Sequence, residues 1–178
     1  MGKVKKVAAN LKNKKSAFLL FSLGLILCFV FSCQCSPQTR DLRGTIAPDF
    51  TLKDLEGKTF HLQGEQGKMV LIIFTTTWCP ACTDFIPIYK KIHEIYGKEE
   101  NFVMVNVDIE EPDDRVRAFA RANHITYRIL MDSKGEVRKD YGIMGVPSFV
   151  LIDEEGKWLS ANIEEIFAIL RTAFGRDV

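Results

Sequence analysis

The cysteines Cys79 and Cys82, separated by Pro80 and one alanine, directly follow an apolar run and most constrain what this chain can fold into. The run 69–74 is β-rich and apolar throughout, which is typical of a central strand covered on both faces. Apolar residues then recur at helical spacing over residues 85–96. The sequence therefore predicts a strand that leads into a helix whose first turn holds two thiols close enough to bridge.

Pro80 and Cys79 suit the first turn of such a helix. A proline fits the first helical position, because the N–H that it lacks would have no partner within the helix. Cys79 then falls at the N-cap, where free backbone N–H groups and the positive end of the helix dipole favour a thiolate. The spacing indicates thiolate chemistry, and Pro87 further along should bend the helix.

Residues 1–35 have the parts of an export leader: a lysine-rich start, an apolar run over 17–31 and a polar segment after it. An apolar run of about 15 residues is short for a membrane-spanning helix. Val30-Phe31-Ser32-Cys33 resembles a bacterial lipoprotein box, which makes Cys33 a candidate site for a lipid anchor. An uncleaved anchor helix and cleavage near Ser36 are the alternatives. We divide the chain into a leader (1–35), a polar tether (36–47) and one domain (48–178).

The charge of the chain is unevenly spread, because six lysines lie before Ser16 and precede every acidic residue. The remaining 18 basic side chains stand against 23 acidic ones, a net charge of −5. No basic stripe with interleaved aromatic residues is present in this acidic part, which argues against nucleic acid as a partner. Export places the thiols where disulfides persist, and this favours a redox pair over a structural metal site.

Strands and helices alternate after the leader, which indicates an α/β domain with a central mixed sheet flanked by helices. Residues 50–52 and 59–62 alternate around a turn and predict an N-terminal β-hairpin. A helix should begin at Asp113 or Asp114 as its cap. The remaining expected elements are strands at 102–107, 129–131 and 148–152 and helices at 136–141 and 163–174. The turn after residue 152 is too short for a crossover, so the final strand pair should be antiparallel.

The ordered set of motifs resembles the thioredoxin fold and, within it, the TlpA/ResA-like family. The motifs are Trp78 with the cysteine pair, segment 47–52 (Ala-Pro-Asp-Phe-Thr-Leu), segment 106–108 (Asn-Val-Asp) and segment 145–147 (Gly-Val-Pro). This family comprises extracytoplasmic, membrane-tethered thiol-disulfide oxidoreductases with a helical insert after the second main strand. The resemblance covers about residues 44–174.

The resemblance implies a role for each matching residue. Cys79 would be the exposed nucleophile and Cys82 the resolving thiol, with Trp78 and Pro80 beside them. Pro147 would be a cis-proline that faces the cysteines and leaves the backbone of Val146 free to pair with a client polypeptide.

The resemblance also implies the setting in which the cysteines work. It implies no cofactor and no metal beyond the redox-active disulfide itself. Clients would be exported protein thiols or disulfides such as apocytochrome c, and electrons would come from a thiol carrier in the membrane. The protein would then be extracytoplasmic and membrane-associated through its leader, most simply as a reductant.

Two acids that often accompany such cysteines are replaced in this chain. Ile73 stands where thioredoxin has a buried acid, and Phe85 stands where this family often has glutamate. Asp84 is next to that position but about 100° round the helix. The group that handles the proton of Cys82 is therefore left open.

Two other functions compete with disulfide exchange. A peroxiredoxin-like peroxidase would have threonine three residues before its cysteine, as Thr76 is here, but it would have proline where Ile72 stands. A metallochaperone or redox-regulated binding module of this fold would have a Cys-x-x-x-Cys and a late histidine, and both are absent from the sequence. The histidines His61, His93 and His124 are scattered along the sequence. We interpret His93 and His124 as solvated side chains and the acidic run 110–114 as a solvated loop with a helix cap.

Overall fold

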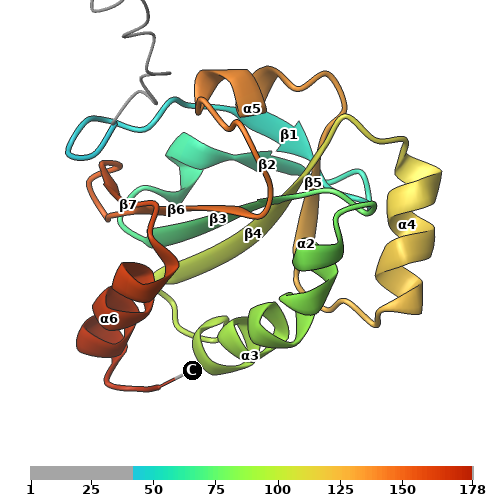
Figure 1. Ribbon diagram of the computed structural model, residues 1–178. Helices are drawn as coiled ribbons and strands as arrows, with labels where there is room; N and C mark the ends of the chain where they lie inside the picture. Colours follow the sequence, from blue (N-terminus) through green and yellow to red (C-terminus); the bar gives the residue numbers. More distant parts are fainter. Residues whose placement is uncertain (1–41, 178) are drawn as a thin grey trace, which may run out of the picture. The chain divides into compact units, whose positions relative to one another are not determined.

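A computed structural model describes residues 42–177 and contains the predicted mixed sheet (Figure 1). Within this range the main sheet has five strands in the order β5-β4-β3-β6-β7. Strands β3, β4 and β5 are parallel neighbours, whereas β6 runs antiparallel to both β3 and β7. The antiparallel final pair was therefore predicted correctly. The strands are β3 (Met69–Thr75), β4 (Phe102–Ile109), β5 (Arg128–Asp132), β6 (Ser148–Ile152) and β7 (Trp158–Ser160).

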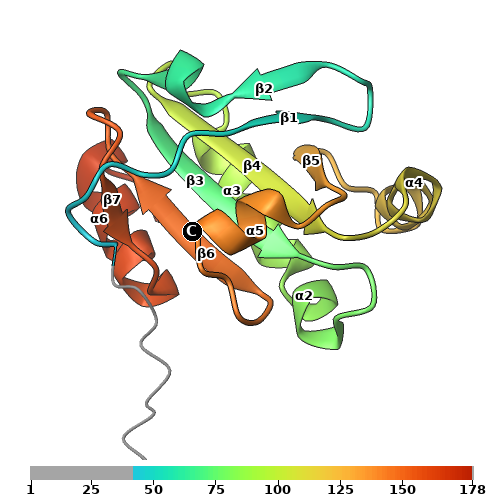
Figure 2. The same cartoon turned by 90° about the horizontal axis from the view of Figure 1, so that it is seen from above.

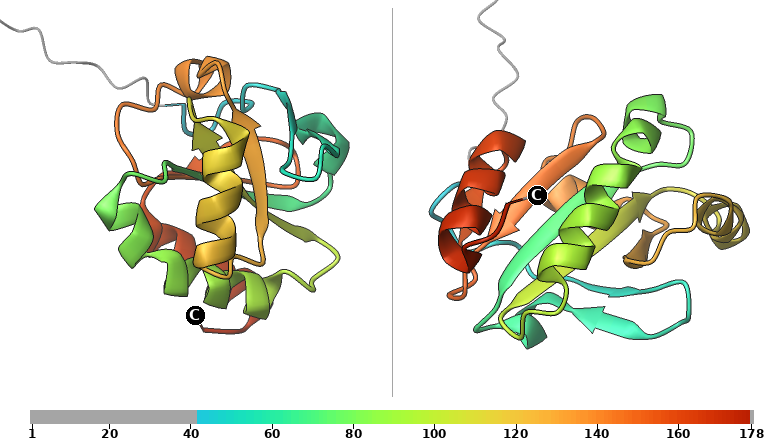
Figure 3. Two further views of the ribbon diagram at one scale, coloured as in Figure 1. Left: turned by 90° about the vertical axis from the view of Figure 1, so that its right-hand side faces the viewer. Right: turned by 90° about the horizontal axis from the view of Figure 1, so that it is seen from below.

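Helices cover both faces of this sheet. Helices α3 (Ile86–Tyr96) and α6 (Ile163–Phe174) lie on one face (Figure 3). The opposite face carries α5 (Glu136–Asp140) and the hairpin of β1 (Thr51–Lys53) and β2 (Thr59–His61) (Figure 2). Three shorter or connecting elements complete the set: η1 (Leu62–Glu65), α2 (Pro80–Asp84) and α4 (Asp113–Ala122). Helix α4 follows β4, so the expected insert after the second main strand is confirmed.

The central strand β3 supplies side chains to two separate cores, which explains its uninterrupted apolar sequence. Ile72 and Phe74 pack in the core beneath α5 and the hairpin. Leu71 and Ile73 point to the other face and pack beneath α3 and α6. All seven residues of β3 are buried, as a strand covered on both faces requires.

Asp54 holds the hairpin turn and joins it to the main sheet. Its Oδ1 accepts hydrogen bonds from the backbone N–H groups of Glu56 (3.1 Å) and Lys58 (2.8 Å). Its Oδ2 accepts a hydrogen bond from Nε of Arg128 on β5 at 2.8 Å. Backbone pairing of Asp54 with Leu130 adds a further link. The hairpin is therefore attached to β5 as well as packed over the core.

Residues 44–47, at the end of the predicted tether, are hydrogen-bonded along β7. The N–H of Gly44 donates to the carbonyl oxygen of Trp158 (2.8 Å), and the N–H of Trp158 donates to the carbonyl oxygen of Thr45 (2.9 Å). Ile46 forms a backbone bridge with Lys157. This segment thus lies alongside the edge strand of the sheet. Residues 1–41, which include the predicted leader and Cys33, lie outside the described residues.

Two prolines set helix boundaries in ways that the sequence predicted only in part. Pro87 lies in the first turn of α3, and the helix after the cysteines is broken at Phe85 into α2 and α3. The expectation of an acidic cap at Asp113 or Asp114 is wrong, because Pro112 is the N-cap of α4. The two aspartates instead occupy the first turn, where the helix dipole favours carboxylates.

None of the helices within residues 42–177 combines the length and apolarity that crossing a membrane requires.

Candidate functional site

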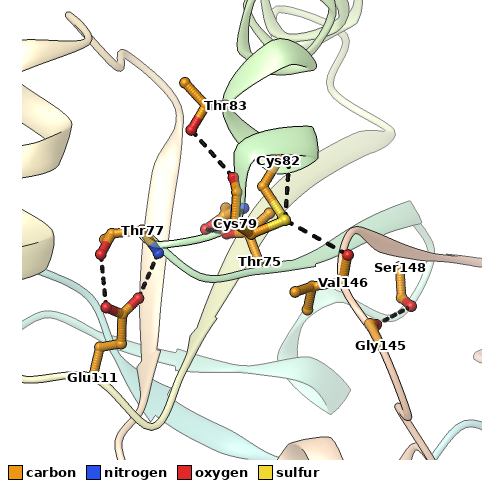
Figure 4. The surroundings of a disulfide bond; sticks show 10 residues. Thr75, Thr77, Cys79, Cys82, Thr83, Glu111, Gly145, Val146 and Ser148 are labelled. Carbon is orange, nitrogen blue, oxygen red and sulfur yellow. Dashed lines mark hydrogen bonds between the residues drawn. A yellow bond between two sulfur atoms is a disulfide. The ribbon is translucent and has the colours of Figure 1, made fainter.

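Cys79 and Cys82 form a disulfide at the point where β3 passes into α2 (Figure 4). Their Cα atoms are 5.2 Å apart. Cys79 is the N-cap of α2, and its Sγ accepts a hydrogen bond from the backbone N–H of Cys82 at 3.1 Å. The hydroxyl of Thr83 donates to the carbonyl oxygen of Cys79 at 3.2 Å. One free N–H group of the first helical turn, that of Cys82, therefore points at the sulfur of Cys79.

The loop before β6 brings Val146 and Pro147 to the cysteine pair, because β6 is the antiparallel neighbour of β3. The peptide bond between Val146 and Pro147 is cis. The carbonyl oxygen of Val146 lies 3.6 Å from Sγ of Cys79 (Figure 4). The hydroxyl of Ser148 donates to the carbonyl oxygen of Gly145 at 2.6 Å, which fastens the loop behind Val146.

An open groove of about 390 Å³ passes over Cys79. Trp78 and Met144 lie on it with 67% and 81% of their surfaces exposed. Two large apolar side chains that are exposed side by side on one groove indicate a contact surface next to Cys79. The groove is also lined by Thr76, Pro80, Ile109, Glu110, Arg138, Ile143, Gly145 and Val146. The predicted site residues Trp78, Cys79, Pro80 and Val146 therefore meet along one groove.

The two cysteines differ in what they face rather than in how exposed they are. Cys79 is 5% exposed and Cys82 is 3% exposed, so Cys79 is not the exposed residue that the resemblance implied while it is in the disulfide. Cys79 lines the open groove, whereas Cys82 lines a small cavity inside the domain. One sulfur of the disulfide is therefore next to the open groove, and the other is next to an internal cavity.

The internal cavity beside Cys82 has a volume of about 10 Å³ and a mainly apolar lining into which a few polar side chains reach. Thr76 Oγ1, Tyr89 Oη and Asp108 Oδ1 are buried without a hydrogen-bond partner, and all three residues line it. The nearby hydroxyl of Thr75 and the amide of Asn106 satisfy one another at 2.9 and 3.0 Å. A cavity of roughly 10–15 Å³ with two or more polar partners holds about one water molecule.

Asp108 is the titratable acid of this cavity, and sequence analysis did not single out its carboxyl group. It is 3% exposed. Burial, together with the neighbouring Glu111 carboxylate, raises the pKa of Asp108 to about 8. The residue lies at the end of β4 directly beside Thr75 of β3. A carboxyl group with a raised pKa therefore lines the same cavity as Cys82.

Glu111 is a second residue whose role the sequence concealed. The expectation that the run 110–114 is simply a solvated loop and cap is wrong for Glu111, which is 4% exposed. Its carboxylate accepts hydrogen bonds from both the backbone N–H and the hydroxyl of Thr77 (Figure 4). Nη1 of Arg115 lies 3.6 Å from the same carboxylate. No local pattern marks Glu111, since its partner Thr77 is 34 residues away.

The other acids and histidines considered from the sequence lie elsewhere. Asp84 is exposed, and Phe85 stacks near Tyr89 and Phe149 at centroid distances of 5.9 and 6.0 Å. Among the histidines, His61 contacts Asp49 at 2.9 Å, His93 is partly buried against the Tyr127 ring and His124 is exposed at the end of α4. Within residues 42–177, no three His, Cys, Asp or Glu side chains are grouped as metal ligands.

Comparisons with known proteins agree with this geometry. The model of the AhpC/TSA family matches residues 43–158. The thioredoxin-like protein YneN of Bacillus subtilis (strain 168) is 40% identical over 114 residues, which cover 64% of this chain and 66% of that relative, just under two thirds of its length. Thiol-disulfide oxidoreductase ResA of Geobacillus thermodenitrificans (strain NG80-2) is 32% identical over 143 residues, or 80% of this chain and 82% of that relative.

A solved structure supports the same relationship at the level of the fold. The solution structure of a candidate protein disulfide isomerase from Bacteroides thetaiotaomicron superimposes with a TM-score of 0.67 and 31% identity. The superposition covers 74% of this chain and 87% of that chain. The thioredoxin fold predicted from the sequence is therefore confirmed.

Proposed function

Because this chain belongs to the AhpC/TSA family and, within it, to the ResA-like thiol-disulfide oxidoreductases, we propose that Cys79 and Cys82 exchange disulfides with exported proteins. The observation that carries the proposal is the position of the cysteine pair, which opens on the Cys79 side into a groove with exposed Trp78 and Met144. A client segment would lie in this groove against Val146.

The reaction runs in two exchange steps. The thiolate of reduced Cys79 attacks one sulfur of a client disulfide, which breaks the client S–S bond and forms a mixed disulfide. Cys82 then attacks Sγ of Cys79, which forms the Cys79–Cys82 disulfide and releases the second client thiol. Two electrons pass to the client, whose two sulfurs take up the two protons that the enzyme thiols give up.

We infer that the direction is reductive and that clients are of the apocytochrome c type, as in the resemblance on which the assignment rests. A thiol carrier in the membrane would regenerate the dithiol. The reduction potential of the Cys79–Cys82 pair tests the direction: a value near or below roughly −270 mV supports a reductant, whereas one near roughly −120 mV contradicts it.

The exchange itself is tested with the full chain and a protein disulfide such as that of insulin. Cys79→Ser should abolish turnover, whereas Cys82→Ser should accumulate a mixed disulfide between Cys79 and the client, because the release step is lost. Full turnover by Cys79→Ser would refute the assignment.

We also infer that the leader keeps the domain at the outer side of a membrane, with Cys33 as the lipid attachment site. Metabolic labelling with a radioactive fatty acid should mark the natural chain but not Cys33→Ser. Unlabelled protein that stays in the membrane fraction would instead support an uncleaved anchor helix. Unlabelled protein in the soluble extracytoplasmic fraction would support cleavage near Ser36.

A peroxidase activity is the second candidate, favoured by Thr76 and by the family model. Ile72, however, lies in the middle of β3 and is paired with Val105 and Val150 on both sides. Proline at this position would remove a hydrogen bond from the sheet. Consumption of hydrogen peroxide by the purified protein, at a rate well above that of a free thiol, would favour the peroxidase.

A further inference from the structure

Three unpartnered polar atoms point to a proton pathway behind the disulfide. They belong to Thr76, Tyr89 and Asp108, and the three residues line the cavity that Cys82 also lines. Buried polar atoms are nearly always hydrogen-bonded, to protein or to an internal water molecule. Three such atoms around one cavity large enough for about one water molecule therefore indicate a site that holds a water beside Cys82.

We propose that Asp108 accepts the proton of Cys82, through the water of this cavity, when Cys82 resolves the mixed disulfide. The inference rests on the proposed function, because it concerns the second of the two exchange steps. The proposed proton acceptor lies near the end of β4. The positions considered from the sequence were Ile73, Asp84 and Phe85.

The other titratable groups around the cavity are less suited to this role. The Glu111 carboxylate is already held by Thr77 and approached by Arg115. Burial raises the pKa values of Tyr89 and Tyr127, so both phenols stay protonated at neutral pH. Asp108 alone among the residues lining this cavity is a carboxylic acid, and its pKa of about 8 is close to that of an ordinary thiol.

The step balances as a proton transfer coupled to disulfide exchange. The step needs the ionised form of Asp108, which is the minor form at pH 7 because its pKa is about 8. In that form the Cys82 S–H bond breaks, and its proton passes through the water to the Asp108 carboxylate. The Cys82 thiolate attacks Sγ of Cys79, the S–S bond to the client breaks, and the electron pair leaves with the client sulfur. The proton on Asp108 is then returned to solvent or to the departing thiolate.

The test measures the two steps separately in the full chain. The leader cysteines Cys28, Cys33 and Cys35 are changed to serine so that only the site thiols react. An aryl disulfide that releases thionitrobenzoate is added to the reduced protein in a stopped-flow instrument. Attack by Cys79 releases the first thionitrobenzoate at a rate proportional to the reagent concentration. Attack by Cys82 releases the second at a rate independent of it.

Asp108→Asn should slow the second phase about 100-fold at pH 7, the lower range for loss of a positioned base, and leave the first phase within about threefold. The reduction in the second-phase rate should stay nearly constant up to about pH 8, because Asp108 and the thiol ionise in parallel there. It should disappear above the ordinary thiol pKa of about 8.5, where Cys82 ionises without help. A merely structural role would slow both phases, and high pH would not restore them.

Asp84→Asn is the matched control. Asp84 is the acid next to Phe85, and Phe85 occupies the position where the family often has glutamate. This variant should leave both phases unchanged. An unchanged second phase in Asp108→Asn, or a slow one in Asp84→Asn, would overturn the proposal. Natural protein that shows both phases but leaves insulin disulfides intact would instead contradict the proposed function, so the two failures are distinguishable.

Discussion

Glu111 holds Thr77 by both of its hydrogen-bonding groups, the backbone N–H and the hydroxyl, with the hydroxyl donating at 2.7 Å. Thr77 lies two residues before Cys79, in the connection between β3 and α2. Glu111 lies in the connection between β4 and α4. The interaction therefore attaches the segment before Cys79 to the connection between β4 and α4.

Replacing Glu111 should loosen this connection. In Glu111→Ala the N–H of Thr77 loses its partner, and we expect a loss of about 1–3 kcal/mol in the free energy of unfolding. Thr77→Val is the control, because it removes only the hydroxyl bond and should cost about 0.5–1.5 kcal/mol. Urea unfolding of the two variants measures the difference. Equal losses would show that the backbone N–H does not need Glu111.

Asp108 should make the stability of the domain fall as pH rises. Its pKa is about 8 in the folded protein and near the usual 3.8 when unfolded. Between these values the folded form keeps a proton that the unfolded form has released, so unfolding becomes easier with rising pH. Asp108→Asn should raise the melting temperature most above pH 8 and have little effect below pH 4. A gain that is equal at all pH values would contradict this account.

The exposed apolar side chains on the groove should matter for protein clients and not for small disulfides. Trp78→Ala and Met144→Ala should each raise KM for a protein disulfide several-fold, since burying such a side chain contributes about 1.5–3 kcal/mol when the contact is complete. The rate with the aryl disulfide should be unchanged. Ile46→Ala is the matched control, because Ile46 is 65% exposed but does not line the groove. A similar rise in KM for Ile46→Ala would argue for a non-specific effect.

Asp54 should contribute stability that acid removes. Burial alone would raise its pKa, but hydrogen bonds from Lys58 and Arg128 outweigh burial and lower the pKa below its usual value of 3.8. The stabilisation is therefore present above pH 4 and is lost as the carboxylate takes up a proton at lower pH. Asp54→Asn should destabilise the domain by about 1–3 kcal/mol at pH 7, and its effect should fall as pH decreases below the usual value of 3.8.

A second turn offers a matched control for Asp54. Asp153 accepts the same kind of turn bonds, from the N–H groups of Glu155 (3.1 Å) and Lys157 (2.7 Å), but it has no arginine partner. Asp153→Asn should therefore cost clearly less at pH 7. Thermal melts over a range of pH compare the two variants, and equal losses would show that Arg128 adds nothing.

The sequence predicts the alternation of strands and helices, the antiparallel final strand pair and the cysteine site because their signals are local. The uninterrupted apolar run of β3, the spacing of Cys79 and Cys82 and the short turn before Trp158 each reflect the geometry of neighbouring residues. The break at Phe85 was also within reach, since Pro87 removes a helical hydrogen bond.

The acids behind the site could not be predicted in this way. Asp108 and Glu111 lie in a segment whose composition is that of a solvated loop, and their surroundings come from β3, α2 and α3. The structure extends β4 to Ile109, two residues beyond the predicted strand. With that extension, parallel pairing to β3 places Asp108 beside Thr75, at the base of the connection to Cys79.

The pairing of residues 44–47 with Trp158 also bears on self-association. An edge strand with free N–H and C=O groups is a template for strands of other molecules. Gly44, Thr45 and Ile46 occupy this edge beside β7. A domain shortened to begin at Pro48 would uncover both the edge and part of the Trp158 environment. Residues 44–47 thus cover an edge that would otherwise be free to pair with strands of other molecules.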